Sequence, residues 1–316
     1  MVKLLKAIVA AGAAAGAADL LLGNYFIENN MSKKGIKKTI EAAALSPSEE
    51  SACFYFSDEA VKGIEFYRKT LCSDISTVNR SGETVYADYY SNEKPSNVYV
   101  ISCHGYTGLP SQNSIFTMHF LEMGFNVLLP YLRGHGISEH DYCTMGWLER
   151  LDIIDWINYI IKDNHDAKII LHGASMGAAT VMMATGENLP ENVICCIEDC
   201  GYTSLWDQYS IQIKNFTSLP PEIILNFINP VFKIKFGFDI KQASAVNQVK
   251  KSKTPTLFIH GDKDLTVPFS MLNTLYENAG CEKEKLVVEN ATHAASGYCY
   301  PEIYWNAVSR FINKYI

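Results

Sequence analysis

The chain of 316 residues lacks an excess of positive charge, because 27 Lys and Arg stand against 34 Asp and Glu for a net charge of −7 at pH 7. Proteins that bind nucleic acid usually present a basic surface to the phosphate backbone. We therefore expect no nucleic-acid partner. Hydrophobic residues make up 48% of the chain and charged residues 19%, which is typical of a globular protein and excludes a mostly disordered one.

Cysteine pairs with the spacing of a metal site are also missing. The nine cysteines are spread from Cys53 to Cys299, with neither CxxC nor a paired Cys/His spacing, so we predict no structural metal. Cys195 and Cys196 lie in an apolar run and are interpreted as small buried side chains. Free thiols in this number favour a reducing compartment over a secreted one.

No apolar run reaches the roughly 20 residues that a strong membrane span needs. The start of the chain comes closest, because residues 7–18 are mostly Ala and Gly and follow Lys3 and Lys6. Two interpretations stay open: a short signal or anchor segment, and an Ala-rich helix that lies on the domain. We predict an apolar leader and helical connector over residues 1–50, with membrane contact through residues 1–30 and an otherwise cytoplasmic location.

Short apolar strands alternate with helical patterns through most of the chain. Strands without alternating polarity, separated by helices, indicate a parallel sheet covered on both faces. We therefore predict an α/β fold with a mostly parallel central sheet, in one domain over residues 51–316. The predicted strands are residues 75–90, as two strands around a Ser81–Gly82 turn, and 97–105, 125–134, 168–173, 192–201, 254–261 and 285–289.

One segment, about residues 205–253, interrupts this alternation because it contains no convincing core strand. A structureless loop of this length is uncommon in a compact domain, so we predict an inserted helical lid. The segment is rich in lysine and phenylalanine. That composition fits either a charged outer face over ordinary packing or a lid whose basic rim surrounds an acyl pocket. Phe216 and Phe227, together with Tyr106, are the predicted lining of the substrate pocket.

A serine flanked by glycines stands between a predicted strand and a predicted helix, in Gly173-Ala174-Ser175-Met176-Gly177. A nucleophilic serine needs a sharp turn that pushes its hydroxyl out of the sheet, and the glycines relieve the crowding of that turn. The helix that follows directs backbone N–H groups and its positive dipole end towards developing negative charge. The sequence therefore predicts Ser175 as a nucleophile.

A serine hydroxyl needs a base to take its proton. His260 and His293 are the histidines that follow Ser175 in the chain. His293 lies in a polar loop after the last predicted strand, which suits an exposed base. His260 lies at a strand end, where a structural role is the better interpretation. We predict His293 as the base.

The base in turn needs an acid to orient its ring, and three aspartates are candidates. Asp264 lies far enough into its loop to reach the histidine, so it is the predicted acid. Asp262 directly follows a glycine and is interpreted as a turn cap. Asp199, at the end of the preceding strand, stays open as a rival.

The oxyanion of a tetrahedral intermediate needs N–H donors. One predicted donor is the backbone N–H of Met176, which follows the nucleophile. The other is the backbone N–H of Tyr106, in the loop of residues 103–108. His104 closes the strand before this loop and is predicted to be structural.

These motifs resemble the α/β-hydrolase superfamily over about residues 75–316, through HGYTG, RGHGISE, GASMG, HGDKDLTVP and ATH. The arrangement is most similar to bacterial serine-aminopeptidase-like or Bem46-like α/β hydrolases, whose members often begin with a short apolar segment. The resemblance implies the α/β-hydrolase fold, a Ser-Asp-His triad and hydrolysis. It makes the RGHG loop a family feature, in which we assign Arg133 and His135 structural roles.

We expect a serine hydrolase that cleaves a carboxylic ester or thioester of a small-molecule acyl substrate, without a metal or organic cofactor. Two alternatives stay open. One is a small-peptide aminopeptidase on the same triad, which would need an acidic pair to hold the substrate ammonium group. No such pair stands in a recognisable lid position. The other is a non-catalytic ligand-binding protein on the same scaffold.

Overall fold

The computed structural model describes residues 15–45 and 57–316. At its centre lies an eight-stranded sheet in the order β1-β2-β4-β3-β5-β6-β7-β8. β2 pairs antiparallel with both of its neighbours, and the strands from β4 to β8 pair in parallel. The predicted α/β fold with a mostly parallel central sheet is confirmed. The strands are β1 (Ser73–Val78), β2 (Thr84–Tyr90), β3 (Val98–Cys103), β4 (Asn126–Pro130), β5 (Lys168–Ala174), β6 (Val193–Asp199), β7 (Thr256–Gly261) and β8 (Lys283–Val288).

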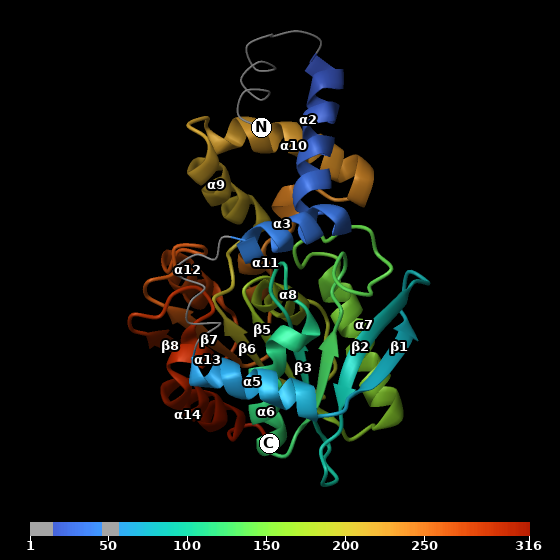
Figure 1. Cartoon of the computed structure of the whole chain (residues 1–316), viewed down its shortest axis with the longest axis vertical. Helices are drawn as coiled ribbons and strands as arrows, with labels where there is room; N and C mark the ends of the chain where they lie inside the picture. The colour runs from blue at the N-terminus through green and yellow to red at the C-terminus, as the bar shows by residue number, and fades with distance from the viewer. Residues whose placement is uncertain (1–14, 46–56) are drawn as a thin grey trace.

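Helices cover both faces of this sheet (Figure 1). Successive side chains of a strand point to opposite faces, so Ile169 and Leu171 of β5 join one core while Ile170 joins the other. The first core is closed by α7 (Glu149–Asp163), α8 (Met176–Thr185), α11 (Ala245–Val249) and α12 (Ser270–Asn278). The second is closed by α5 (Asp58–Lys69), α6 (Ser114–Glu122), α13 (Ser296–Cys299) and α14 (Pro301–Ile312).

Both neighbouring cysteines of β6 are buried, as predicted: Cys195 packs in the second core and Cys196 in the first. Cys299 differs from the expectation of free thiols, because it is disulfide-bonded.

The amino-terminal helices α2 (Ala15–Asn30) and α3 (Lys33–Leu45) belong to the folded domain. Ile27, Met31 and Ile36 are at most 2% exposed and pack in the same core as α7 and α8. This arrangement corresponds to a helix that lies on the domain. No helix in the described part of the chain is long and apolar enough to cross a membrane, and the Ala-rich start before residue 15 lies outside that part.

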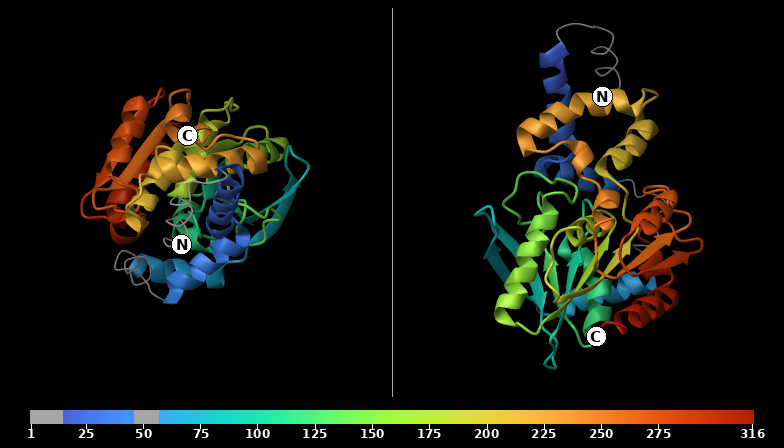
Figure 2. Two further views of the ribbon diagram at one scale, coloured as in Figure 1. Left: turned by 90° about the horizontal axis from the view of Figure 1, so that it is seen from above. Right: turned by 180° about the vertical axis from the view of Figure 1, so that it is seen from behind.

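The insertion at residues 205–253 is helical, with α9 (Leu205–Phe216), α10 (Pro221–Phe236), a short 3₁₀ helix (Ile240–Gln242) and α11. α2 lies beside α10 at one end of the molecule (Figures 1 and 2). The two helices approach closely because Gly23 lacks a Cβ, which would collide with Val231. Glu28 of α2 also accepts hydrogen bonds of 2.7 Å from Lys235 and from the Tyr142 hydroxyl.

We predict that α2 contributes measurably to the stability of the domain. Replacing Ile27 by Ala removes a side chain that is 0% exposed, so the free energy of unfolding should fall by about 3 kcal/mol. Leu21→Ala is the matched control on the same helix, because Leu21 is 71% exposed and should change stability by less than about 0.5 kcal/mol. Urea unfolding followed by circular dichroism measures both values. Equal stabilities for the two variants would contradict a core role for α2.

Candidate active site

Ser175 lies at a strained turn between β5 and α8. Its backbone has a φ of 55° and a ψ of −115°, a conformation that non-glycine residues rarely adopt. The flanking glycines permit the turn: a Cβ on Gly173 would collide with the backbone of Gly177, and one on Gly177 would collide with the carbonyl oxygen of Cys103. The sequence folds into this turn because only glycine fits at both of these positions.

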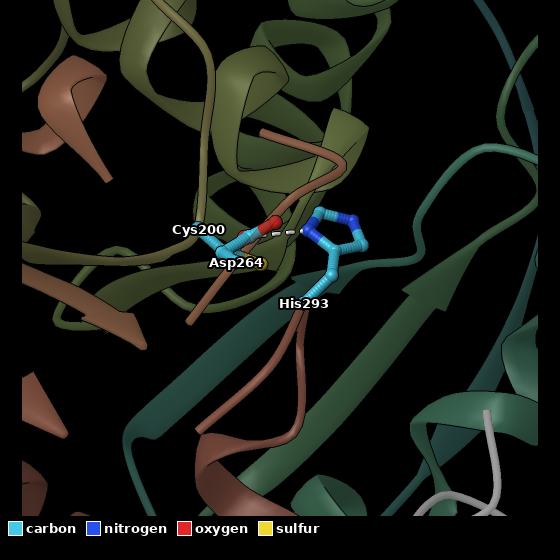
Figure 3. A group of neighbouring side chains, drawn as sticks. All are labelled: Cys200, Asp264 and His293. Atoms are coloured by element: carbon cyan, nitrogen blue, oxygen red, sulfur yellow. Dashed lines mark hydrogen bonds and ion pairs between the residues drawn. The ribbon is translucent and has the colours of Figure 1, made fainter. Parts of the chain in front are cut away.

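The structure brings His293 and Asp264 to this serine from two separate loops. His293 Nε2 lies 2.8 Å from Ser175 Oγ, and His293 Nδ1 lies 2.7 Å from Asp264 Oδ2 (Figure 3 shows the second contact). The hydrogen bonds assign the protons: Nδ1–H donates to the carboxylate and Nε2 accepts from the serine hydroxyl. The side chain of Asp264 is fully buried, and that of His293 is 17% exposed.

Asp264 is held as an ionised carboxylate by four donors. Oδ1 accepts the backbone N–H groups of Thr266 (2.9 Å) and Val267 (2.8 Å), while Oδ2 faces His260 Nε2 at 3.1 Å as well as His293. Burial raises the pKa of Asp264, but the hydrogen bonds from His260 and His293 outweigh burial and hold the pKa at about 2.

Sequence reasoning gave His260 a structural role and missed its contact with Asp264. His260 Nε2 also faces the carbonyl oxygen of Val267 at 2.9 Å, so this nitrogen carries the proton and donates to two acceptors. The spacing of four residues between His260 and Asp264, on either side of a tight turn, is the signal that could have revealed the contact.

The other two candidate acids, Asp199 and Asp262, lie in surroundings that differ from those of Asp264. Neither oxygen of Asp199 has a hydrogen-bond partner among the described residues, and burial raises its pKa to about 7. Burial also raises the pKa of the neighbouring Glu198, to about 8. Asp262 accepts the backbone N–H of Asn290 at 2.6 Å and so ties two loops together. Asp264 is the carboxylate that bonds to the imidazole.

The two backbone N–H groups predicted as oxyanion donors belong to Met176 and Tyr106. Met176 is the first residue of α8, where N–H groups have no acceptor within the helix. The Tyr106 N–H has no hydrogen-bond acceptor in the described part of the chain. The loops that carry them are adjacent, because a Cβ on Gly105 would lie 3.6 Å from the Cβ of Ser175.

Two buried histidines hold the Tyr106 loop. His135 Nε2 accepts the N–H of Thr107, and His104 Nε2 accepts the N–H of Leu132, each at 3.2 Å. Burial lowers the pKa of His104 to about 3 and that of His135 to about 4, so both rings are neutral and free to accept. The neighbouring Arg133 pairs with Asp152 through two hydrogen bonds of 2.6 and 2.8 Å.

A second serine and histidine pair exists inside the sheet. Ser102 Oγ lies 2.7 Å from His172 Nδ1, on the adjacent strands β3 and β5. Both side chains are enclosed, and their other partners are Asn113 and the Tyr304 hydroxyl. Among the described residues this pair has no carboxylate partner, and its hydroxyl is buried, so it is a structural hydrogen bond of the core.

Two groups of side chains in the described part have the donor types of a metal site. Cys200, Asp264 and His293 place one ligand atom each within 4.8 Å of one another (Figure 3), and Cys72, Asp74 and Asp88 do the same elsewhere. In the first group, Asp264 and His293 are already hydrogen-bonded, and burial keeps the pKa of the Cys200 thiol well above its usual range. A cation there would have to displace protons from both the thiol and the imidazole.

A cleft of about 500 Å³ opens beside Ser175 and His293. Tyr106 lines it, as predicted, but Phe227 does not, and the side chain of Phe216 lies outside the described residues. The described lining contains no residue of the 205–253 insertion, whose Phe236 and Phe238 instead pack against Tyr142 and Trp147. The wall that sequence reasoning missed comes from α5, through Ala60, Ile64, Tyr67 and Arg68.

Known proteins are similar to this chain in sequence and in architecture. Residues 98–218 match the α/β-hydrolase fold family. The uncharacterized protein YqkD of Bacillus subtilis is 30% identical over 217 residues, which cover 68% of this chain and 71% of YqkD. The chain belongs to the α/β-hydrolase fold family.

Solved structures agree with this hydrolase in fold. An esterase of Pyrococcus furiosus superposes with a TM-score of 0.63 at 24% identity, over 80% of this chain and 95% of the esterase. A Butyrivibrio proteoclasticus protein with bound ferulic acid gives a TM-score of 0.58 at 19% identity, over 76% and 98% of the two chains. A puromycin-hydrolyzing peptidase of Mycobacterium tuberculosis gives 0.54 at 17% identity, over 72% and 36%.

We predict that His135 makes the stability of this hydrolase depend on pH. Its pKa is about 4 when folded and near its ordinary 6.5 when unfolded, so the unfolded chain takes up the proton first as the pH falls. The stability that His135 contributes is complete above pH 6.5 and is lost as the pH falls towards 4. Compared with His135→Gln, which cannot titrate, the advantage of the wild type in unfolding free energy should shrink by about 2 kcal/mol between pH 7 and pH 5.

Urea unfolding of both proteins at the two pH values measures this difference. An advantage that stays constant would mean that His135 keeps an ordinary pKa in the folded protein.

Proposed function

We propose that this protein is a serine hydrolase that cleaves a carboxylic ester or thioester through an acyl-enzyme intermediate. The observation that carries the proposal is the continuous hydrogen-bonded path from Ser175 through His293 to the ionised Asp264, at 2.8 and 2.7 Å. Such a path activates a serine that is otherwise a poor nucleophile. Ser175 and His293 line a cleft large enough for a small acyl substrate.

In this mechanism, Ser175 Oγ attacks the acyl carbon while its proton passes to His293 Nε2. Asp264 stabilises the imidazolium that forms, and the N–H groups of Met176 and Tyr106 donate to the oxyanion. The alcohol or thiol leaves with the proton from Nε2. Water then attacks the acyl carbon of the acyl-enzyme and gives a proton to His293 Nε2. The proton passes back to Ser175 Oγ as the acid leaves, which regenerates Ser175.

The alternative functions receive less support from the cleft. An aminopeptidase needs carboxylates to hold the substrate ammonium group, and no Asp or Glu occurs among the described residues that line the cleft. A non-catalytic binding protein has no need for the strained Ser175 turn or for a buried, ionised Asp264. Within the family, we propose that the chain stands near the serine-aminopeptidase-like and Bem46-like hydrolases in sequence while acting on esters.

We predict that Ser175 is required for turnover. Ser175→Ala should lower ester hydrolysis by about 10³-fold or more and should abolish labelling by a fluorophosphonate probe, which reacts quickly only with an activated serine. The measurement is a panel of acyl esters, thioesters and aminoacyl amides, tested with the full-length wild type and variant. More than a tenth of wild-type activity in Ser175→Ala would overturn the proposal, and faster cleavage of aminoacyl amides than of esters would establish the aminopeptidase alternative.

We further predict that Asp264 and Asp199 differ as acids. Asp264→Asn should lower kcat by about 10³-fold, because an amide cannot stabilise the imidazolium or select its tautomer. Asp199→Asn should change kcat less than about threefold, since burial raises the pKa of Asp199 to about 7 and the amide resembles the protonated acid. Steady-state kinetics at pH 7 compares the two variants. A larger loss in Asp199→Asn would move the orienting role to Asp199.

A further inference from the structure

One positive charge in the active-site cleft has no partner among the described residues. Arg68 of α5 lines the same cleft as Ser175 and His293. Its guanidinium makes no hydrogen bond or ion pair within residues 15–45 and 57–316. The lysines of the same helix differ, because Lys62 pairs with Glu59 at 2.6 Å and Lys69 pairs with Glu65 at 3.0 Å. Within the described part of the chain, the charge of Arg68 is therefore available to a ligand.

Arg68 is the one Lys or Arg in the described lining of the cleft. The described lining contains no carboxylate that could neutralise the guanidinium. This contrasts with the chain as a whole, whose net charge is −7. Arg68 is solvent-exposed at this cleft, and a cationic group in a concave site attracts anions more strongly than the same group on a flat surface.

The periodicity of α5 places Arg68 in the cleft. Ala60, Ile64, Tyr67 and Arg68 stand at helical spacings of four, seven and eight residues, so they share one face, and that face lines the cleft. Along this face the wall changes from apolar side chains to a phenol and a guanidinium. A substrate that fits this wall has an apolar part and an anionic end.

Packing fixes the helix that carries Arg68. Gly63 lies so close to Ile115 of α6 that a Cβ would collide with it. Glu59 meets His119 of α6 at 3.0 Å, and Phe66 packs on Tyr90 with ring centroids 5.8 Å apart. Because the backbone is held on both sides, binding an anion would have to order only the arginine side chain.

We propose that Arg68 forms an anion-binding subsite, and that the substrate is an ester whose acyl or alcohol part carries a carboxylate or a phosphate. This rests on the proposed ester hydrolysis at Ser175. A guanidinium offers two parallel N–H donors that match the oxygens of either anion. The competing explanation is that Arg68 only complements the dipole at the carboxyl end of α5, a role that Lys69 in the same last turn shares.

The experiment compares matched substrates with the full-length protein. The first pair is an aryl hexanoate and the aryl half ester of adipic acid, which differ in a terminal carboxylate. The second pair is a fatty acyl ester of glycerol and the same ester of glycerol phosphate. The first pair tests an anion on the acyl side, and the second tests an anion on the alcohol side. The variants are Arg68→Ala, Arg68→Lys and the control Lys69→Ala.

We expect the wild type to prefer the anionic member of at least one pair. Arg68→Ala should lower kcat/KM for that substrate about tenfold, mainly by raising KM, because the contact exists in both the ground state and the transition state. The neutral member should keep its kcat/KM, and Arg68→Lys should recover part of the loss. Lys69→Ala removes an equivalent last-turn charge outside the described lining, so it should leave the preference unchanged.

The inference is overturned if the wild type prefers neither anionic member, or if Arg68→Ala and Lys69→Ala change the preference equally. Fluorophosphonate labelling and hydrolysis of the neutral esters report on the proposed function separately. A protein that keeps both while lacking the anion preference remains a serine hydrolase without this subsite. A protein in which Ser175→Ala leaves ester hydrolysis intact loses the proposed function itself.

Discussion

The candidate site depends on how closely the turn between β5 and α8 passes the end of β3. Gly177 sits against the carbonyl oxygen of Cys103, at a distance that leaves no space for a Cβ. This contact lets Ser175 take its strained conformation and sets the first turn of α8 beside the loop that follows β3. Ser175 and the two N–H groups proposed as oxyanion donors are therefore positioned by backbone packing within the parallel sheet.

The hydrogen bonds around the buried carboxylate of Asp264 are the second constraint on the site. Asp264 accepts from two backbone N–H groups, from His260 and from His293, so a fully buried charge is compensated on all sides. Asp199, one strand away, is also buried and has no hydrogen-bond donors among the described residues, and its pKa rises where that of Asp264 falls. The difference between the two aspartates is made by hydrogen bonds, since burial acts on both in the same direction.

The amino-terminal helices connect this site to the insertion. The Tyr106 hydroxyl donates to the carbonyl oxygen of Asn30 at 2.6 Å, which ties the loop of Tyr106 to the end of α2. α2 in turn packs against α10 and is joined to it by Glu28 and Lys235. The insertion thus supports the site through α2, while the described wall of the cleft comes from α5. A segment with the composition of a leader is, from residue 15 onwards, part of the domain that holds the site.

The sequence by itself determined the features that depend on local pattern. The alternation of apolar strands and helices predicts the parallel sheet, and the glycines around Ser175 predict its turn, because period and turn chemistry are read from neighbouring residues. The order of Ser175, Asp264 and His293 along the chain was likewise enough to predict them as nucleophile, acid and base. Tertiary structure alone decided what depends on residues far apart in the chain. These features are the hydrogen bonds that favour Asp264 over Asp199, the placement of Ile27 and Met31 in the core, and the use of α5 rather than the phenylalanines of the insertion to line the cleft. Each of them arises from contacts between residues that are far apart in the chain. Such contacts produce no repeating pattern in the sequence from which they could be predicted.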